Sequence, residues 1–425
     1  MLSKERNELA CRSGAGTAGG KLFRQYWQPI ALTTDFPADG APLPIQALGE
    51  KFVLFKDEAG QLGLLNLHCA HRGADLSYGR VEDGGLRCIY HGWLFDVKGK
   101  CLQQPAEPPG RQFCERVRQK AYPVRELGGM IFAYLGEGEP PVLPEWECLT
   151  AAPEHRFMVR SLERCNWLQG LEGDLDPYHL SFLHLAMKAD IQAARGTRDA
   201  QHYEFFRRGI PRMEIEFTEF GVRIYGMRDL DNQAYLRISN YIAPNIAAVA
   251  GGAEGDGYMM VWHVPIDDEH HFKYRLDFRR TEQPPRFDSQ IQWTPGAENL
   301  PPRRLETRWL QDRAEMKDKW FAGLGSDFGL HDNWATEAMG PMYDRSQEHL
   351  GHGDRGIAGM RRALLDAIDA VAEGKGAPFR FTDPEELRQK MTEIVVTGLI
   401  APDKDKYKEV FHEHRLAAQR RVGKA

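Results

Sequence analysis

Short apolar runs separated by turn residues fill the first third of the chain. They lie at 28–36, 43–48, 51–55, 64–67 and 128–136, and polar, Gly-containing segments such as DEAGQLG lie between them. Runs of this length bounded by turn residues are typical of β-strands. We therefore expect an all-β module over residues 25–140 that ends in the Pro- and Gly-rich segment GEGEPPVLPEW.

The rest of the chain mixes longer strands with helices. Apolar and alternating patterns predict strands at 213–227, 235–243, 258–266 and 271–278, and helices around 178–190, 333–340 and 355–371. This predicts an α+β domain over residues 141–425 with a largely antiparallel sheet flanked by helices. Residues 1–24, with a short helix at 4–11, are expected to pack on it, and the Pro-rich segment 281–305 is expected to be an extended loop.

Composition limits the class of protein. The chain has 425 residues, enough for two or more domains. Its 55 basic and 61 acidic residues give a net charge of -6, which argues against a nucleic-acid partner. No apolar run approaches the roughly 20 residues that span a bilayer. The charged N-terminus MLSKERNELACRS lacks a signal-peptide core, so we expect a cytoplasmic protein.

Two mixed ligand pairs lie close together in the all-β module. Cys69 and His71 form C-x-H, and Cys88 and His91 form C-x2-H. Two thiolates and two imidazoles suit a Rieske-type [2Fe–2S] cluster, in which one iron has sulfur ligands and the other has nitrogen ligands. A zinc site is the alternative, although structural zinc sites usually group Cys with Cys and His with His. The other five cysteines are irregularly spaced and are expected to be free thiols.

A second motif, D-x2-H-x4-H, is formed by Asp176, His179 and His184. Two histidines and one carboxylate hold the metal of non-haem iron oxygenases. Residues five apart on a regular α-helix differ by about 140° around its axis, so the two histidines require a local π-type widening if they lie on one helix. Packed or exposed histidines without a metal are the alternative. Asp176 itself is either a carboxylate that receives the second N–H of His179, or an N-cap with Pro177 at the first helical position.

These motifs resemble those of the Rieske non-haem iron ring-hydroxylating oxygenases. The resemblance runs from NELACRSGAGTAGGKLFRQYW to DRSQEHLGHGDRGIAGMRRALL, and it is to the oxygenase component of the phthalate dioxygenase group. That group acts on phthalates, phenoxybenzoates and methoxylated lignin-derived acids. Glu172, four residues before Asp176, favours it over the arene dioxygenases, which tend to have Asn there.

The resemblance also implies the third iron ligand. The segment LHDNWATEAMGPMYDRSQEHLG matches one that carries the liganding Asp just before a helix, and this match selects Asp332. By chemistry alone Asp327, Asp344 and Asp354 are equally suitable, and an ordinary helix cap is the alternative for Asp332. His331 is given no ligand role, and His263 is interpreted as a sheet residue.

By resemblance, Asp176 links His179 to the cluster ligand His91 of a neighbouring subunit, which implies a homotrimer or stacked trimers. Asp174 is the weaker candidate for this role. No flavin or nicotinamide fingerprint occurs in the chain, so a separate reductase with flavin and a ferredoxin-type cluster is expected to supply electrons from NADH.

The predicted reaction uses O2 to hydroxylate a carboxylated aromatic compound, and O-demethylation of a methoxylated aromatic acid is the alternative. A Rieske electron-transfer protein and a zinc-stabilised binding module are the hypotheses from other classes. For the substrate, Arg223 and Arg228 lie five apart on one predicted strand and therefore on opposite faces. Arg228 is the predicted carboxylate ligand because a guanidinium binds a carboxylate through two parallel hydrogen bonds, and a surface ion pair with Asp229 or Asp231 is the alternative.

Overall fold

The computed structural model describes residues 1–187, 207, 209–250, 256–284 and 302–422. Parts of two expected elements, the helix at 178–190 and the loop at 281–305, fall outside the described residues. Within the described ranges, no helix is both long and apolar enough to cross a membrane.

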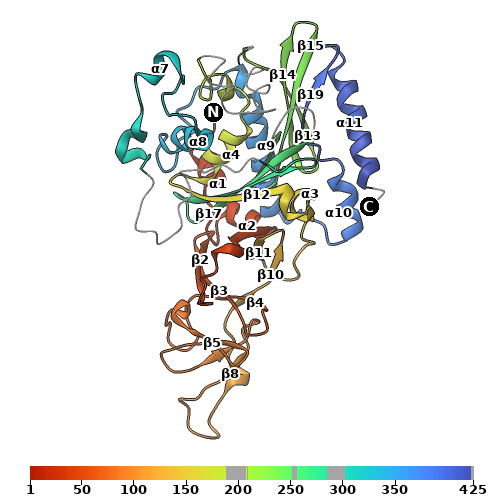
Figure 1. Ribbon diagram of the computed structural model, residues 1–425. Helices are drawn as coiled ribbons and strands as arrows, with labels where there is room; N and C mark the ends of the chain where they lie inside the picture. The colour runs from red at the N-terminus through yellow and green to blue at the C-terminus, as the bar shows by residue number, and fades with distance from the viewer. Residues whose placement is uncertain (188–206, 208, 251–255, 285–301, 423–425) are drawn as a thin grey trace.

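The N-terminal module consists of three small antiparallel sheets, which confirms the all-β prediction (Figure 1). One sheet joins β1 (Trp27–Leu32), β11 (Met130–Tyr134) and β10 (Val124–Leu127). The second joins β2 (Leu43–Ala47), β3 (Glu50–Lys56), β4 (Leu62–Asn66) and β9 (Ala121–Tyr122). The third joins β5 (Arg80–Glu82), β6 (Gly85–Arg87), β7 (Leu94–Phe95) and β8 (Cys101–Gln103). Figure 1 shows β5 and β8 at the lower tip of the molecule.

A large antiparallel sheet organises the second half of the chain. Its order is β12-β18-β17-β16-β15-β14-β13, and β19 also pairs with β15. The strands are β12 (Arg156–Glu163), β13 (Arg212–Thr218), β14 (Gly221–Leu230), β15 (Gln233–Ile242), β16 (Ile246–Ala250), β17 (Gly257–Pro265), β18 (His271–Arg279) and β19 (Thr397–Ala401). All four predicted strand regions are present, while β12, β16 and β19 were not predicted.

Helices cover this sheet and its edges. Their bounds are α1 (Lys4–Cys11), α2 (Ala18–Phe23), α3 (Glu147–Thr150), α4 (Trp167–Leu175), α7 (Glu315–Asp318), α8 (Phe328–Glu337), α9 (Arg355–Ala372), α10 (Pro384–Met391) and α11 (Tyr407–Val422). The helix predicted at 355–371 is α9. The N-terminal helices α1 and α2 contact α9, and Arg6 of α1 donates to Asp369 of α9 at 2.9 Å.

Side-chain alternation divides the sheet into two faces with different neighbours. On β17, Val261 packs in one core with Leu168 and Leu171 of α4, whereas Trp262 packs in another core with Phe132 of β11. Because successive strand residues point to opposite faces, α4 lies on one side of the sheet and the β1-β11-β10 sheet lies on the other. The segment at 136–146 therefore interrupts the succession of strands along the sequence, but the hydrophobic core is continuous from the N-terminal module to the large sheet.

One predicted element is wrong in kind. In place of a helix from residue 178, the described part of this segment is a 3-10 turn, η5 (His179–Ser181), followed by further turns. The regular helix, α4, precedes it and ends at Leu175. The aromatic residues at 178 and 182 suggested an amphipathic helix, but the described backbone forms η5 and further turns instead.

Candidate metal centres

The two Cys/His loops have the same backbone geometry. In the first, Gly73 N–H donates to Cys69 O at 2.8 Å, and Cys69 N–H donates to the carbonyl five residues further on at 2.8 Å. In the second, Gly92 and Cys88 make the same two bonds at 2.9 Å each. Both glycines have left-handed backbones, with φ of +72° and +75°. The two loops are thus matched turns that present one cysteine and one histidine each.

The side chains of these loops converge. Cys69 and Cys88 are buried, the His71 and His91 ring centroids lie 4.6 Å apart, and His71 stacks on Trp93 at 4.4 Å. Burial raises the pKa of the Cys69 thiol to about 11, so a thiolate there needs a positive partner. His91 Nδ1 is buried without a hydrogen-bond partner, as a nitrogen reserved for a metal would be. These residues fit an iron–sulfur cluster.

The same geometry disfavours a single zinc ion. Four ligands at about 2.0 to 2.3 Å from one zinc would lie close together as a tetrahedron. In the described part of the chain, two groups of three possible metal ligands have their ligand atoms within 4.8 Å of one another. Neither group includes a residue of these two loops. The wider spacing suits a cluster of two irons, in which each metal takes one pair.

The second centre brings together His179, His184 and Asp332. His179 lies in η5, His184 follows it in the next turn, and Asp332 lies on α8. His184 Nε2 is 3.1 Å from His179 Nε2 and 2.9 Å from Asp332 Oδ1, and His179 Nε2 is 3.6 Å from Asp332 Oδ1. Ligands at right angles around one ion, each about 2.1 Å from it, are separated by about 3 Å. The triangle therefore has the size of a metal site with open positions.

Proton positions support a metal at this triangle. His331 Nε2 lies 3.0 Å from Gly325 O and must donate to it, since a carbonyl only accepts. In neutral His331, Nδ1 then accepts from His184 Nδ1 at 3.1 Å, which leaves a lone pair on His184 Nε2. On His179, Nδ1 faces Asp176 Oδ2 at 3.5 Å, which leaves Nε2 free of a proton in the same way. Two imidazole lone pairs and a carboxylate then face one another, an arrangement that a cation stabilises.

The electrostatics agree with an ionised Asp332. Burial acts to raise its pKa, but His184, His179 and Lys273 together lower it to about 2. For His179, burial acts to lower the pKa and Asp176 raises it, with a net increase.

The other carboxylates considered as third ligand have different partners. Asp327 is the N-cap of α8 and accepts from Leu330 N–H, Asp344 accepts from Ser346, and Asp354 accepts from Gly351 N–H. The residue that caps this helix is therefore Asp327, and not Asp332, for which a helix cap was the alternative role. Asp332 lies inside α8 and not just before it, which corrects the expected position. Asp332 lies five residues after the cap residue, and its carboxylate faces the two histidines.

Asp176 bonds to the turn that carries His179, but it is not the N-cap of a helix. It follows the last residue of α4, so it does not cap a helix of its own, but its carboxylate accepts from the N–H groups of Tyr178 at 2.8 Å and His179 at 3.2 Å. The same carboxylate faces the His179 ring. The carboxylate of Asp174, the weaker candidate for this role, has other partners than Tyr178 and His179. It pairs with His263 at 2.9 Å and with Lys273 at 2.8 Å.

The two arginines of β14 lie on opposite faces, as predicted. Arg223 donates to Glu216 at 2.8 Å and lies 5.0 Å from the Phe411 ring of α11. Arg228 is buried on the face of α4, where it donates to Pro177 O at 3.0 Å and to Ser181 Oγ at 3.2 Å. The surface ion-pair alternative for Arg228 is therefore excluded by its burial.

Sequence reasoning missed two residues of the iron centre. His331 contacts His184 directly, and its position beside Asp332 in the sequence was the available signal. Arg237 of β15 is 6% exposed, and its Nε is buried without a hydrogen-bond partner among the described residues. Burial lowers its pKa, and Asp174, Asp176 and Asp332 act on it from nearby. Nothing in the local sequence distinguished it from a surface arginine.

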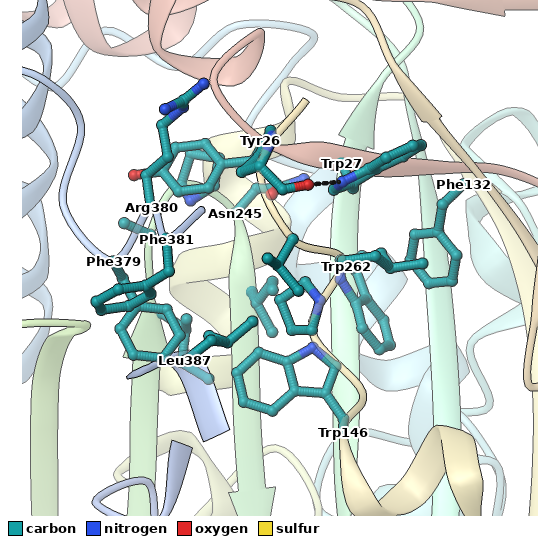
Figure 2. A pocket seen from close by; sticks show the side chains of 18 residues that line it. Tyr26, Trp27, Phe132, Trp146, Asn245, Trp262, Phe379, Arg380, Phe381 and Leu387 are labelled. Carbon is teal, nitrogen blue, oxygen red and sulfur yellow. Dashed lines mark hydrogen bonds between the residues drawn. The ribbon is translucent and has the colours of Figure 1, made fainter. Parts of the chain in front are cut away.

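A well-formed cavity of the molecule lies away from this centre. Figure 2 shows it between Trp27, Phe132, Trp146 and Trp262, where Trp27 Nε1 donates to Pro141 O at 2.8 Å. Trp262 points to the face opposite α4. The cavity measures about 40 Å³, far below the roughly 150 Å³ in which a benzene ring fits. It is a packing gap between the N-terminal module and the large sheet, and not a substrate site.

Comparison with known proteins agrees with both centres. The Rieske [2Fe-2S] domain family matches residues 26–123, and the family described as LigXa C-terminal domain like matches residues 133–395. The chain is 34% identical to the 5,5'-dehydrodivanillate O-demethylase oxygenase subunit of Sphingobium sp., over 90% of this chain and 84% of that one. It is 36% identical to the phenoxybenzoate dioxygenase subunit alpha of Ectopseudomonas oleovorans, over 84% of each chain.

A third relative and a solved structure extend this result. The phthalate 4,5-dioxygenase oxygenase subunit of Pseudomonas putida is 33% identical over 89% of this chain and 88% of its own length. The terminal oxygenase of carbazole 1,9a-dioxygenase from Novosphingobium sp. KA1 superposes with a TM-score of 0.57, at 23% identity, over 84% of this chain and 97% of that one, which shows the same fold. The chain therefore belongs to the Rieske non-haem iron oxygenases, as an oxygenase subunit of the phthalate dioxygenase-like group with a [2Fe–2S] cluster and a mononuclear iron.

Proposed function

We propose that this chain is the terminal oxygenase of a cytoplasmic multicomponent system that uses O2 and electrons from NADH, through a separate reductase, to hydroxylate a carboxylated aromatic compound. The convergence of two lone-pair imidazoles and one ionised carboxylate on one point carries this proposal. The cluster ligands are Cys69, His71, Cys88 and His91, and the iron ligands are His179, His184 and Asp332. The iron supplies the oxygen-activating chemistry, and the protein orients the substrate and excludes side reactions.

An acidic substrate is supported by two buried arginines on the sheet face that carries the iron centre. Burial lowers the pKa of Arg228 to about 10, and the nearby charge of Arg237 acts in the same direction. Two desolvated guanidinium groups that repel each other are stabilised by an added anion. A carboxylate is the anion that a guanidinium binds with defined orientation.

The two arginines have different surroundings, which suggests different roles. Arg228 already donates to Pro177 O, Ser181 Oγ and, at 3.3 Å, Gly209 O. These bonds fix the turn that carries His179. Arg237 makes no hydrogen bond to this turn among the described residues, and its Nε is a buried donor without a partner there. We therefore assign the substrate carboxylate to Arg237, and the predicted residue Arg228 to the support of the turn.

Paired substitutions test this assignment. Arg237→Met should weaken the use of an aromatic acid far more than the use of its amide or methyl ester, since only the acid loses an ionic partner. Arg228→Met should lower turnover of acid and amide alike, because the His179 turn is loosened. Selective loss of the acid in Arg228→Met would return the carboxylate to Arg228, and equal losses in Arg237→Met would end the proposal for Arg237.

O-demethylation is the second candidate, and the similarity to the 5,5'-dehydrodivanillate O-demethylase oxygenase subunit favours it. Hydroxylation of a methoxy carbon yields a phenol and formaldehyde, whereas attack on the ring yields a hydroxylated ring. Turnover of a panel of methoxylated and unsubstituted aromatic acids with a surrogate reductase, followed by assay for formaldehyde, separates the two. A Rieske electron carrier without oxygenase activity would consume no oxygen in response to any of these acids.

Exposed side chains near the cluster loops and at the iron centre support a homotrimer with electron transfer between subunits. Figure 1 places the cluster module at the lower tip of the molecule and α8 in its upper half. Around the cluster loops, Tyr78, Ile89 and Tyr90 are exposed, which is typical of a contact surface. At the iron centre, the side chains of Asp176 and His179 are 28% and 20% exposed. A second copy that places its His91 beside Asp176 would join the two centres, and a head-to-tail contact of this kind closes as a ring.

The electron donor is proposed to carry a ferredoxin-type cluster. Solved complexes of the carbazole 1,9a-dioxygenase oxygenase with its ferredoxin share the present fold, with TM-scores of 0.57. A flavin-containing reductase would complete the supply from NADH.

Metal and sulfide analysis of the purified protein tests the proposal as a whole. Three irons and two sulfides per chain are expected. Two irons per chain would indicate an electron carrier, and zinc without sulfide would indicate a binding module.

A further inference from the structure

Two buried glutamine side chains, one near each metal centre, bond to backbone groups beside the metal ligands. Gln119 lies between η3 (Cys114–Arg116) and β9 and is 3% exposed, and Gln169 lies on α4 and is 1% exposed. The side-chain amide of each one makes three hydrogen bonds to the backbone. A primary amide has two N–H donors and one carbonyl acceptor, so each amide uses both donors and its acceptor.

Gln119 holds the backbone on both sides of the cluster ligand Cys69. Its Nε2 donates to His68 O at 2.9 Å and to Asn66 O at 2.7 Å, and its Oε1 accepts from Ala70 N–H at 2.7 Å. His68 and Ala70 are the residues directly before and after Cys69. One side chain therefore fixes the path of the chain into and out of this ligand.

The backbone of Gln119 is bonded to the other half of the module. Its N–H donates to Gly99 O at 2.8 Å, in the turn between β7 and β8. A Cβ at Gly99 would lie 1.9 Å from Gln119 O, so only glycine allows this contact. The Cys88 loop lies between β6 and β7 of this third sheet, whereas the Cys69 loop follows β4 of the second sheet. Gln119 therefore joins the two sheets that carry the cluster loops.

This link matters because a Rieske cluster takes one ligand pair from each loop. The bonds of Gly73 and Gly92 close each loop on itself, but they do not set the distance from one loop to the other. The side chain of Gln119 acts across that distance. Its loss would leave three backbone groups around Cys69 short of a hydrogen bond in a buried place, which is costly.

Gln169 holds together the two helices on which the iron centre is built. Its Nε2 donates to Thr336 O and to Gly340 O at 2.9 Å each, and its Oε1 accepts from Tyr343 N–H at 2.8 Å. Thr336 Oγ1 in turn donates to the backbone oxygen of Asp332 at 3.0 Å. Because α4 leads into η5 and α8 carries Asp332, this amide links the two parts of the chain that supply the iron ligands.

We propose that Gln119 and Gln169 are positioning residues, each of which sets the geometry of one metal centre. Gln119 fixes the Cys69 loop relative to the Cys88 loop, and Gln169 fixes α8 relative to α4. Both act through the backbone beside a ligand and not on the ligand atoms. The proposal rests on the proposed function for the identity of the ligands.

Substitutions in the complete holoenzyme test the role of Gln119. Gln119→Glu keeps the shape of the side chain but has no N–H to donate to His68 O and Asn66 O, and Gln119→Met removes all three bonds without adding charge. In both variants the rate of cluster loss to an iron chelator should rise roughly 10- to 100-fold. The EPR spectrum of the reduced cluster should change, while the affinity for the mononuclear iron stays that of the wild type. Gln61→Glu, at an exposed glutamine of the same module, is the control.

The matching substitutions Gln169→Glu and Gln169→Met should affect the other centre. Iron(II) affinity, measured after removal of the mononuclear iron, should fall roughly 10- to 100-fold. The EPR spectrum of the nitric oxide complex of this iron should change, while the EPR spectrum of the cluster and its rate of loss stay those of the wild type. Gln233→Glu, at an exposed glutamine of β15, is the control.

The crossed pattern separates positioning from a general loss of stability. A change confined to the glutamine's own centre is the expected result. For either glutamine, any other pattern overturns its role: both centres weakened together, neither weakened, or only the opposite centre weakened. Such a failure leaves the proposed function standing, because the iron and sulfide content of the wild-type protein tests that function separately.

Discussion

The two metal centres of this oxygenase subunit are held in place by different means. The cluster loops take their shape from backbone hydrogen bonds, since Gly73 and Gly92 close matched turns around Cys69 and Cys88. The iron centre takes its shape from side chains, since His331 and Asp176 orient His184 and His179. A backbone-built site depends on few residues close in sequence, whereas a site built from side chains depends on groups that only the fold brings together.

This difference explains what the sequence could predict. The four cluster ligands lie within 23 residues, and the ligand chemistry pointed to them directly. Asp332 lies 148 residues after His184, and several carboxylates suited the role until family resemblance selected one. Over the described residues 178–187 the predicted helix is wrong, because the backbone there forms η5 and further turns. His331 and Arg237 have no local signature, since their roles arise from contacts across the sheet.

Substitution of Asp176 should separate the two centres most completely. Asp176→Asn keeps the size of the side chain but removes the charge that faces His179, and product formation should fall at least roughly 100-fold. The cluster should still assemble with its normal absorption spectrum, because Asp176 is not one of the four proposed cluster ligands. Asp366→Asn, an exposed change on α9, is the control. Normal activity and coupling in Asp176→Asn would refute the bridge between centres.

A change to the proposed cluster ligand His91 should affect the [2Fe–2S] cluster and leave the mononuclear iron bound. His91→Cys adds a thiolate to the cluster, so its reduction potential should fall by roughly 100 mV or more, or the cluster should be lost. Iron bound at His179, His184 and Asp332 should remain, as judged by metal content after removal of the cluster signal. An unchanged potential would mean that another residue ligates the cluster.

The orienting role of His331 predicts a smaller effect on the iron centre. His331→Phe removes the acceptor for His184 Nδ1, and loss of such an outer partner typically weakens metal binding 10- to 100-fold. Iron titration of the metal-depleted protein measures this, with the exposed His412→Phe as control. Wild-type iron affinity in His331→Phe would show that packing alone orients His184.

The smallest expected effect concerns pH and stability around the iron centre. Burial raises the pKa of Glu337 to about 7, above its ordinary value of 4.5. Between these two values the unfolded chain releases its proton first, so this residue's contribution to folding stability is full below pH 4.5 and is lost as the pH rises to 7. The free energy of unfolding of Glu337→Gln should therefore exceed that of the wild type by roughly 1 to 3 kcal/mol at pH 8 and by little at pH 4.5. Thermal unfolding at both pH values, with the exposed Glu306→Gln as control, checks the sign. An equal effect at both pH values would show that Glu337 is not buried in its neutral form.

Subunit complementation tests most directly the claim that one subunit's cluster serves the next subunit's iron. Cys88→Ser removes the cluster and His179→Ala removes the iron site, so each homo-oligomer should be inactive. In randomly mixed rings of the two variants, one half of the donors and one half of the acceptors are intact, so about one quarter of the wild-type activity should return. If mixed rings, confirmed by mass, remain as inactive as the separate variants, electrons do not cross between subunits and the proposed arrangement is wrong.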